Sequence, residues 1–441
     1  MNRRNLARAI AVALISTGLL PVRLPAQGEG VTGPVVTLGE ARRRAQDVDP
    51  SSVAARERVY ASSWERRTAM ADLITPRLTG GLSYIRFSDP FFNFGTGDIS
   101  PSAAAASLEA SYTVLGSGKL AALRSARASL ASAEAGETAA RFGTALETDA
   151  AYFAVVADRE LRGVAADRLT RAEEQLGIAR VRVLAGEAIA SDSLQMVLEV
   201  TRARFDLLRR DSALVASRLR LGRRIGLDGP ADAAPFDTTP PPALPLSQED
   251  AVREMRDQGP EVAAARAEER RAEAVLDAER ESYLPSITFG ATTGAYDSRL
   301  FPSALRRTQV SVSLSLPFWD GGQRELAVAR LRADRSVAMA SRREQERSAA
   351  ERVAEAHAGY TTARAGIELA QIGIAASAEN YRVQRARYAE GATTILEMLE
   401  AQVDLSEAQA ALVQARVAVR LALGQIEALL GRRLFDLSDN Q

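Results

Sequence analysis

The feature of this 441-residue sequence that most constrains its fold is an internal duplication. The segment that begins at Leu38 aligns with the segment that begins at Ser247, and later motifs recur in the same order in both halves. Gly186 and Gly391, for example, occupy matching motifs 205 positions apart. Such self-similarity indicates one structural unit used twice. The chain is therefore predicted to fold as two related halves that pack together.

The duplication also predicts where the parts of the chain begin and end. We expect a first repeat over residues 36–226, a second repeat over 246–431, and a short tail over 432–441. The connecting segment, residues 227–245, contains the run TTPPPALP. Proline lacks the backbone N–H that a helix interior needs, so this linker cannot be helical throughout.

The N-terminus has the composition of an export signal. Three arginines and no acidic residue precede a 12-residue apolar run, Ala9–Leu20, and small residues follow it. This pattern predicts a signal peptide over residues 1–26, cleaved after Ala26. The run is short of the roughly 20 residues of a spanning helix, and no other segment is both long and uncharged enough. The mature chain would therefore lie outside the cytoplasm, either free of the membrane or crossing it as strands.

Each half is predicted to contain a helix, two strands, a long helix, a turn and a shorter helix. The helices are expected at Leu38–Ile74, Lys119–Leu184 and Ser191–Ile225, and again at Ser247–Leu284, Gln323–Ala389 and Thr394–Leu430. At 1.5 Å per residue the long helices would extend about 100 Å and the short ones about 54 Å. Two short helices end to end would match one long helix. Gly186 and Gly391 would form the hairpin turns, since glycine tolerates positive φ.

The helices of the second half carry a seven-residue repeat. Large residues recur at Val353, Tyr360, Ile367, Ile374, Tyr381 and Tyr388, and in the returning helix at Met398, Leu405, Leu412, Val419 and Ile426. Alanine or serine follows most of them three positions later. This pattern predicts close knobs-into-holes packing with a left-handed supercoil. A cytoskeletal-type coiled coil or a soluble bundle would show it too, but the predicted strands argue against both.

Four segments have the pattern of membrane strands. Thr308–Gly322 and Ser107–Gly118 alternate apolar and polar residues, while Arg77–Phe87 and Ser286–Thr293 alternate less regularly. Leu314 and Ser313 would therefore face opposite sides of a sheet, Trp319 would suit an interfacial belt, and Phe87–Asp98 would form an exposed loop. Four strands cannot close a barrel, and an open edge is not tolerated in lipid. Several copies of the chain would have to share one barrel.

The composition excludes several classes of function. Lys+Arg and Asp+Glu both number 56, so no basic excess points to nucleic acid. Cysteine is absent, which removes disulfides and thiolate chemistry, and His357 is the only histidine, which removes a multi-histidine metal site. We assign His357 a structural or solvated role. With no phosphate loop or nucleophile elbow in the sequence, we expect no enzyme, cofactor or metal site.

The stretch RYAEGATTILEMLEAQVDLSEAQA, Arg387–Ala410, is similar to the pattern at the periplasmic tip of TolC family outer-membrane efflux proteins. The resemblance covers about Leu38–Gly431. It implies a mainly α fold with a membrane β-barrel portion: a homotrimer with a 12-stranded barrel in the outer membrane and an α-helical tunnel in the periplasm. It further implies a passive duct for small molecules, metals or proteins in efflux or type I secretion. A periplasmic adaptor (membrane fusion) protein would join this duct to an inner-membrane transporter.

The same resemblance implies roles for residues at the tunnel tip. Glu397 and Glu400 match the acids that narrow the tunnel, and their spacing of three puts both on one helix face. Three copies of each would attract cations, whereas the alternative is a solvated outer face.

A network between the helices is also implied at this tip. Tyr388 matches the family's tip tyrosine, although the seven-residue repeat also explains it, and Ser191 and Asp192 match its partners in the first half. Thr393 occupies the place where some members carry an arginine that bridges to the acid matching Asp192. The closing salt bridge of those members is therefore not expected here in the same form.

Two other classes of function remain as alternatives. A periplasmic coiled-coil adaptor or scaffold would also contain helical hairpins, but adaptors usually carry one hairpin flanked by β-rich domains. A secreted hydrolase would need a catalytic site, and the sequence offers none. The duplicated hairpins, each following a strand pair, favour the outer-membrane duct.

Overall fold

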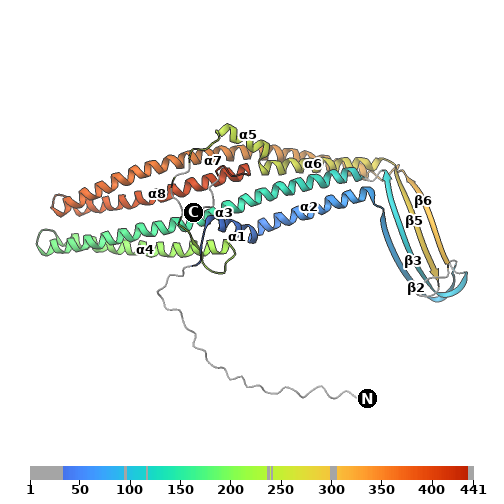
Figure 1. Cartoon of the computed structure of the whole chain (residues 1–441), viewed down its shortest axis with the longest axis horizontal. Helices are drawn as coiled ribbons and strands as arrows, with labels where there is room; N and C mark the ends of the chain where they lie inside the picture. Colours follow the sequence, from blue (N-terminus) through green and yellow to red (C-terminus); the bar gives the residue numbers. More distant parts are fainter. Residues whose placement is uncertain are drawn as a thin grey trace, which may run out of the picture.

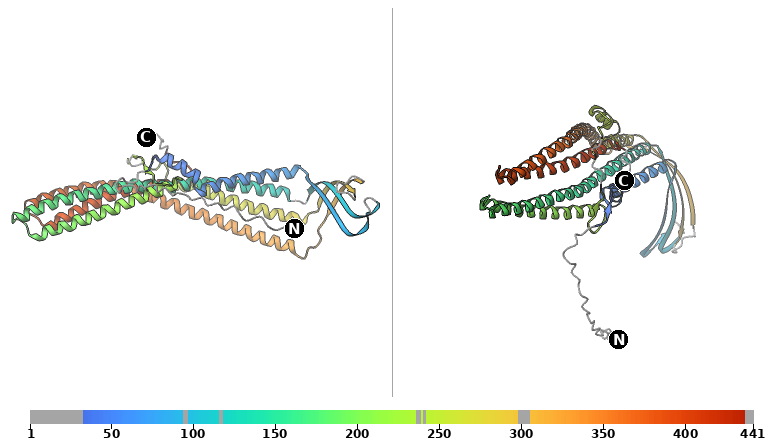
Figure 2. Two further views of the ribbon diagram at one scale, coloured as in Figure 1. Left: turned by 90° about the horizontal axis from the view of Figure 1, so that it is seen from below. Right: turned by 60° about the vertical axis from the view of Figure 1, so that its left-hand side comes forward.

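The computed structural model describes residues 33–93, 97–115, 118–235, 239, 242–297 and 305–435. The predicted signal peptide, 1–26, and the end of the predicted tail lie outside the described residues. Figure 1 shows an elongated molecule with a four-stranded sheet at one end and two helical hairpins at the other. The views in Figure 2 show the same arrangement from two further directions.

The long helices have the predicted bounds. They are α3 (Lys119–Leu184) and α7 (Gln323–Ala389), and each is followed by a shorter antiparallel helix, α4 (Ala190–Arg224) or α8 (Ile395–Leu430). Both long helices start after a glycine in the left-handed region, with φ of 61° at Gly118 and 82° at Gly322. None of the helices in the described ranges is long and apolar enough to cross a membrane.

The prediction of one continuous helix at the start of each half is wrong, because the structure has two helices there. The first half has α1 (Leu38–Val48) and α2 (Pro50–Ile74), and the second has α5 (Gln248–Gln258), α6 (Pro260–Arg280) and the 3-10 turn η1 (Glu281–Tyr283). The prolines cause both breaks. A proline disfavours helical geometry at the preceding residue, so Asp49 and Gly259 have ψ of 124° and 129°, and each proline then starts a new helix.

One antiparallel sheet combines strands from both halves in the order β2 (Arg77–Asn93), β3 (Asp98–Leu115), β5 (Ser286–Asp297) and β6 (Leu305–Ser315). β2 extends further than predicted, so the exposed loop expected over Phe87–Asp98 is wrong for its first part. There the Phe87 and Phe91 rings contact each other with centroids 4.5 Å apart.

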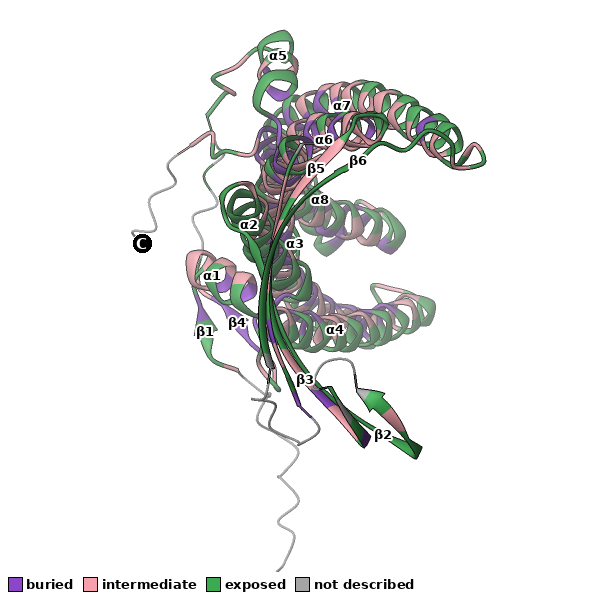
Figure 3. Ribbon diagram, turned by 90° about the vertical axis from the view of Figure 1, so that its right-hand side faces the viewer, coloured by how far each residue is buried: buried purple, intermediate pink, exposed green. Residues whose placement is uncertain are grey.

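The strand register gives the sheet one apolar and one polar face. Leu78 is opposite Ala110, Ala110 is opposite Ala291, and Ala291 is opposite Val310. The alternating rows on the other face contain mainly serine, threonine and glycine. Val310 is 77% exposed in the single chain, and most of the sheet is exposed as well (Figure 3). The predicted alternation is therefore confirmed and extends to the two strands whose pattern was weaker.

The seven-residue seam between α7 and α8 is confirmed. Val353, Tyr360, Ile367, Tyr381 and Tyr388 of α7 are all buried. Met398, Leu405, Val419 and Ile426 of α8 are buried in the same interface. Large residues alternate there with alanines, which lets the two helix axes approach closely.

The middle of the molecule is held together by the linker and a second, small sheet. β1 (Val35–Val36) pairs in parallel with β4 (Asp232–Ala233), which lies within the predicted linker. Arg218 forms an ion pair of 2.6 Å with Asp232. His357 Nε2 lies 3.4 Å from the carbonyl oxygen of Leu246 in the same linker region, where the histidine contacts the chain that crosses α7.

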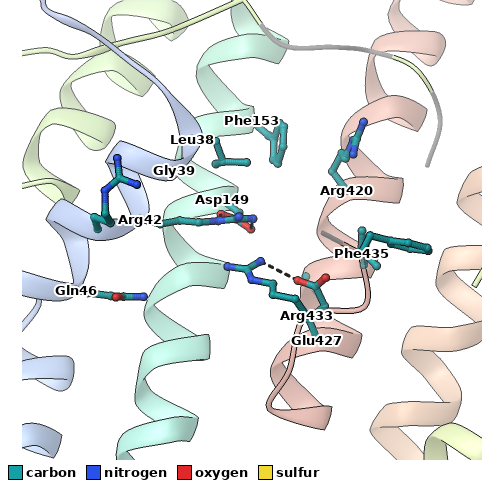
Figure 4. Close-up of a pocket in the computed structure, with 13 residues that line it drawn as sticks. Leu38, Gly39, Arg42, Gln46, Asp149, Phe153, Arg420, Glu427, Arg433 and Phe435 are labelled. Carbon is teal, nitrogen blue, oxygen red and sulfur yellow. Dashed lines mark hydrogen bonds and ion pairs between the residues drawn. The ribbon is translucent and has the colours of Figure 1, made fainter. Parts of the chain in front are cut away.

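A cavity of about 280 Å³ lies beside this region, between α1, α3 and α8 (Figure 4). Arg42 donates two hydrogen bonds of 2.6 Å to Asp149, and Arg433 donates one of 2.7 Å to Glu427. Both carboxylates of the cavity are therefore paired with arginines. These pairs connect α1 to α3 and α8 to the segment that follows it.

Candidate functional site at the hairpin tips

The two helical hairpins end in turns of the same construction. Gly186 and Gly391 both have φ of 77°. The Glu187 N–H donates to the Arg182 carbonyl at 2.9 Å, and the Ala392 N–H donates to the Arg387 carbonyl at 2.8 Å. This is the Schellman arrangement, in which a left-handed glycine ends the helix and satisfies its last carbonyls. It reverses the chain at the end of both long helices.

The returning helix α8 begins with a capped first turn. The Thr394 hydroxyl accepts a hydrogen bond of 3.4 Å from the Glu397 N–H, and the Glu397 carboxylate accepts one from the Thr393 hydroxyl. A carboxylate in the first turn of a helix is favoured by the helix dipole. Thr393 therefore contacts Glu397 across the start of this helix.

Glu397 and Glu400 are both exposed in the single chain. They lie on the first turns of α8, away from the buried seam that contains Met398 and Ala401. Neither carboxylate is part of an ion pair with another described residue. The structure thus leaves both charges on a surface that the chain itself does not cover.

Tyr388, near the end of α7, is buried where the two hairpins meet, with 2% of its surface exposed. It packs in a cluster with Ala179 and Met196 of the first hairpin and with Ile395 and Met398 of its own. Tyr388 is therefore both a buried residue of the seven-residue seam and a residue of the contact between the two hairpin tips.

Arg182 of α3 covers Tyr388, and sequence reasoning did not select it. Its guanidinium carbon lies 4.8 Å from the centroid of the tyrosine ring, and it donates a hydrogen bond to the Tyr388 carbonyl. The same guanidinium forms a 3.9 Å ion pair with Glu187. A Cβ added at Gly391 would lie 3.3 Å from Arg182 Nη2, so the arginine also fits closely against the second turn. One arginine of the first hairpin thus contacts both turns.

The environment of Tyr388 favours its neutral form. Burial raises the pKa of the hydroxyl, and the nearby Asp192 carboxylate raises it further, while Arg182 acts in the opposite direction. The structure therefore brings Asp192 into electrostatic range of Tyr388. Ser191, the other expected partner, is exposed at the start of α4.

The chain resembles known proteins both in sequence and in structure. A family model described as outer membrane efflux protein matches residues 251–432. Protein CyaE of Bordetella pertussis is 26% identical over 294 residues, which cover 63% of this chain and 61% of CyaE. Outer membrane protein OprJ of Pseudomonas aeruginosa is 28% identical over 283 residues, which cover 62% of this chain and 58% of OprJ. The matched region thus spans about three-fifths of each relative.

Solved structures share the whole architecture. CusC, whose structures concern transmembrane channel formation, superposes with a TM-score of 0.77 at 18% identity, over 90% of this chain and 92% of CusC. The outer-membrane channel OprN gives a TM-score of 0.77 at 20% identity, over 90% of both chains. The outer membrane protein VceC of Vibrio cholerae gives 0.75 at 19% identity, over 90% of this chain and 97% of VceC. The predicted fold of duplicated helices and strands is therefore confirmed.

Proposed function

We propose that the chain belongs to the outer membrane efflux protein family, whose model matches residues 251–432, and that it is the outer-membrane channel of a tripartite efflux or type I secretion system. In this role it is a passive duct, and it carries small molecules, metals or proteins away from an inner-membrane pump. It catalyses no reaction. The two repeats, 36–226 and 246–431, each contribute one strand pair and one hairpin.

The observation that carries this proposal is the four-stranded sheet. One face is apolar, and the edge strands β2 and β6 each have a free side that no other described strand pairs with. Backbone groups at an open edge cannot be left unpaired in lipid. Three copies would supply 12 strands and remove every edge, so we infer a homotrimer in the outer membrane with its apolar face toward the lipid.

The helices then form the tunnel that continues from the barrel into the periplasm. In a trimer the tips of α3–α4 and α7–α8 lie farthest from the membrane, where a periplasmic adaptor protein would dock and connect the channel to its transporter. Glu397 and Glu400 of three copies would line the narrowest part. Tyr388, with Asp192 in electrostatic range, lies at the contact between the hairpins that would set this width, and Ser191 is exposed beside Asp192.

A periplasmic adaptor or scaffold is the alternative function. It accounts for the hairpins but offers no use for a four-stranded sheet whose apolar face is exposed. The sheet therefore favours the channel.

Cell fractionation tests the proposal. The full-length chain, expressed with its N-terminal segment, should be recovered with outer membranes without residues 1–26 and should run as a trimer in mild detergent. Recovery as a monomer in the soluble periplasmic fraction would rule the channel out and favour the scaffold.

A further inference from the structure

Two arginines lie on the same face of the sheet as Leu78 and Val310, in the half of the sheet remote from the helices. Arg86 of β2 follows Leu78, Leu82 and Tyr84 at alternate positions, and all of them lie on one face. Arg306 of β6 lies on the same face, because it is opposite Ala295 in the row that continues the apolar side. Both arginines are exposed in the single chain. A charged side chain at the border of an apolar face needs a polar partner.

The positions of the two arginines along their strands match. Arg86 is eight positions from Leu78, the first apolar-face residue of β2, and Arg306 is eight positions from Leu314, the last one of β6. At about 3.3 Å per residue this separation is roughly 26 Å. The apolar band of a membrane barrel is about 25 Å tall. Both guanidiniums therefore lie at the far border of the band, and Tyr84 beside Arg86 suits the same interfacial level.

Among the described residues, neither Arg86 nor Arg306 forms an ion pair with a carboxylate, although many arginines of the helices do. Arg86 and Arg306 also lie on the two edge strands of the sheet, β2 and β6. When copies close the barrel, β6 of one meets β2 of the next, so each seam brings two positive charges onto the lipid side.

We propose that Arg86 and Arg306 bind the phosphate groups of an anionic lipid in the membrane leaflet farthest from the helices, at the seams between subunits. This proposal rests on the proposed trimeric channel. The guanidinium fork matches a phosphate with two parallel hydrogen bonds. The exposed apolar residues that lie nearer the helices on the same face, such as Leu82 and Val310, would contact the acyl chains. An anionic lipid would contact both the arginines and the apolar residues, whereas free phosphate would contact only the arginines.

Lipid binding to the purified trimer tests this site. Native mass spectrometry would compare a bisphosphorylated lipid A with its dephosphorylated form, which differs only in the headgroup charge. We expect the phosphorylated form to bind about tenfold more tightly, and Arg86→Gln with Arg306→Gln to abolish this difference. The matched control is Arg77→Gln with Arg307→Gln, which removes two arginines from the polar face of the same strands and should leave the difference intact.

The other outcomes of the lipid-binding experiment also decide whether Arg86 and Arg306 bind lipid phosphate. Equal binding of the two lipid forms, or an unchanged preference in the Arg86 and Arg306 variant, would overturn the proposal. Displacement of the lipid by millimolar inorganic phosphate would assign the site to free phosphate. If the glutamine variant does not assemble, Arg86→Lys with Arg306→Lys keeps the charge but loses the fork, and it should bind with intermediate affinity. Failure of the channel itself is distinguishable, because the wild-type chain would then form no trimer.

Discussion

The guanidinium of Arg182 lies over the ring of Tyr388, with 4.8 Å between its carbon and the ring centroid. The contact joins α3 of the first hairpin to α7 of the second, close to both turns. Cation–π contacts of this kind contribute about 0.5–2 kcal/mol, with the larger values at desolvated sites. The Tyr388 ring is buried, so this contact is placed to hold the two hairpin tips together.

Arg182→Gln should loosen the tip. The glutamine loses the contact with the Tyr388 ring and the hydrogen bond to the Tyr388 carbonyl, so the hairpins should separate more readily and the channel should conduct more in planar bilayers. Arg180→Gln is the matched control, since Arg180 is exposed on the same helix, and its conductance should be that of wild type. Equal conductance of all three proteins would show that Arg182 does not hold the tip.

Sequence reasoning was most successful for the long helices. No proline interrupts α3 or α7, glycines in the left-handed region precede and follow both, and the heptads of α7 and α8 identify their buried face. Local sequence signals therefore determine where both long helices begin and end and which of their faces is buried. The same reasoning failed at Pro50 and Pro260, where a proline that starts a helix was passed over because the apolar pattern continues on both sides.

The contact of Arg182 could not be predicted for a different reason. The chain is rich in arginine, so one more near a helix end gives no signal by itself. Its position over Tyr388 depends on how two hairpins, separated by about 200 residues, pack against each other. The extent of β2 was also beyond local reasoning, because Pro90 falls in a register irregularity between Arg86 and Phe91, beyond which the pairing with β3 resumes.

Asp49, at the break between α1 and α2, should make stability depend on pH in the acid range. Its carboxylate accepts hydrogen bonds from the Ser51 and Ser52 N–H groups and forms a 2.6 Å ion pair with Arg224. Burial alone would raise the pKa of this carboxyl, but the hydrogen bonds and Arg224 outweigh it and lower the pKa below 3.8. The folded state therefore prefers the charged form. Its contribution is present above the unfolded pKa and is lost as the pH falls through the folded one.

Asp49→Asn isolates this contribution, because asparagine still caps the helix. At pH 7 the variant should lose about 1.5–3 kcal/mol of unfolding free energy, and this deficit should shrink as the pH falls through the lowered pKa of the folded state. Chemical denaturation at neutral and at low pH measures the difference. Asp47→Asn is the control, since that carboxylate is 74% exposed and should matter little. A deficit that persists at low pH would point to the cap and not to the charge.

The faces of β6 predict opposite effects for two adjacent substitutions. Leu314 lies on the apolar face opposite Ile287, and Ser313 lies on the polar face opposite Thr288. Leu314→Arg would place a charge toward lipid and should destabilise the barrel by about 2–4 kcal/mol near the midplane. Ser313→Arg should point into the lumen and leave the yield of trimer unchanged. Similar trimer yields for both variants would mean that the faces are assigned wrongly.

Glu397 and Glu400 should set the ion preference of the channel. Both carboxylates are exposed on the first turns of α8, and like charges around a threefold axis focus a negative potential in a narrow lumen. The combined change Glu397→Gln and Glu400→Gln should keep the trimer, because neither residue lies on the seam of Met398 and Ala401. It should weaken the preference for cations, because six carboxylates then leave the tip. Reversal potentials in a salt gradient measure this preference.

Thr393→Ala is the control for this pair of substitutions. It removes only the hydroxyl that contacts Glu397, so the variant should keep the preference for cations. Loss of assembly would instead make the acids structural, and an unchanged ratio of cation to anion permeability in a normal trimer would mean that they face outward.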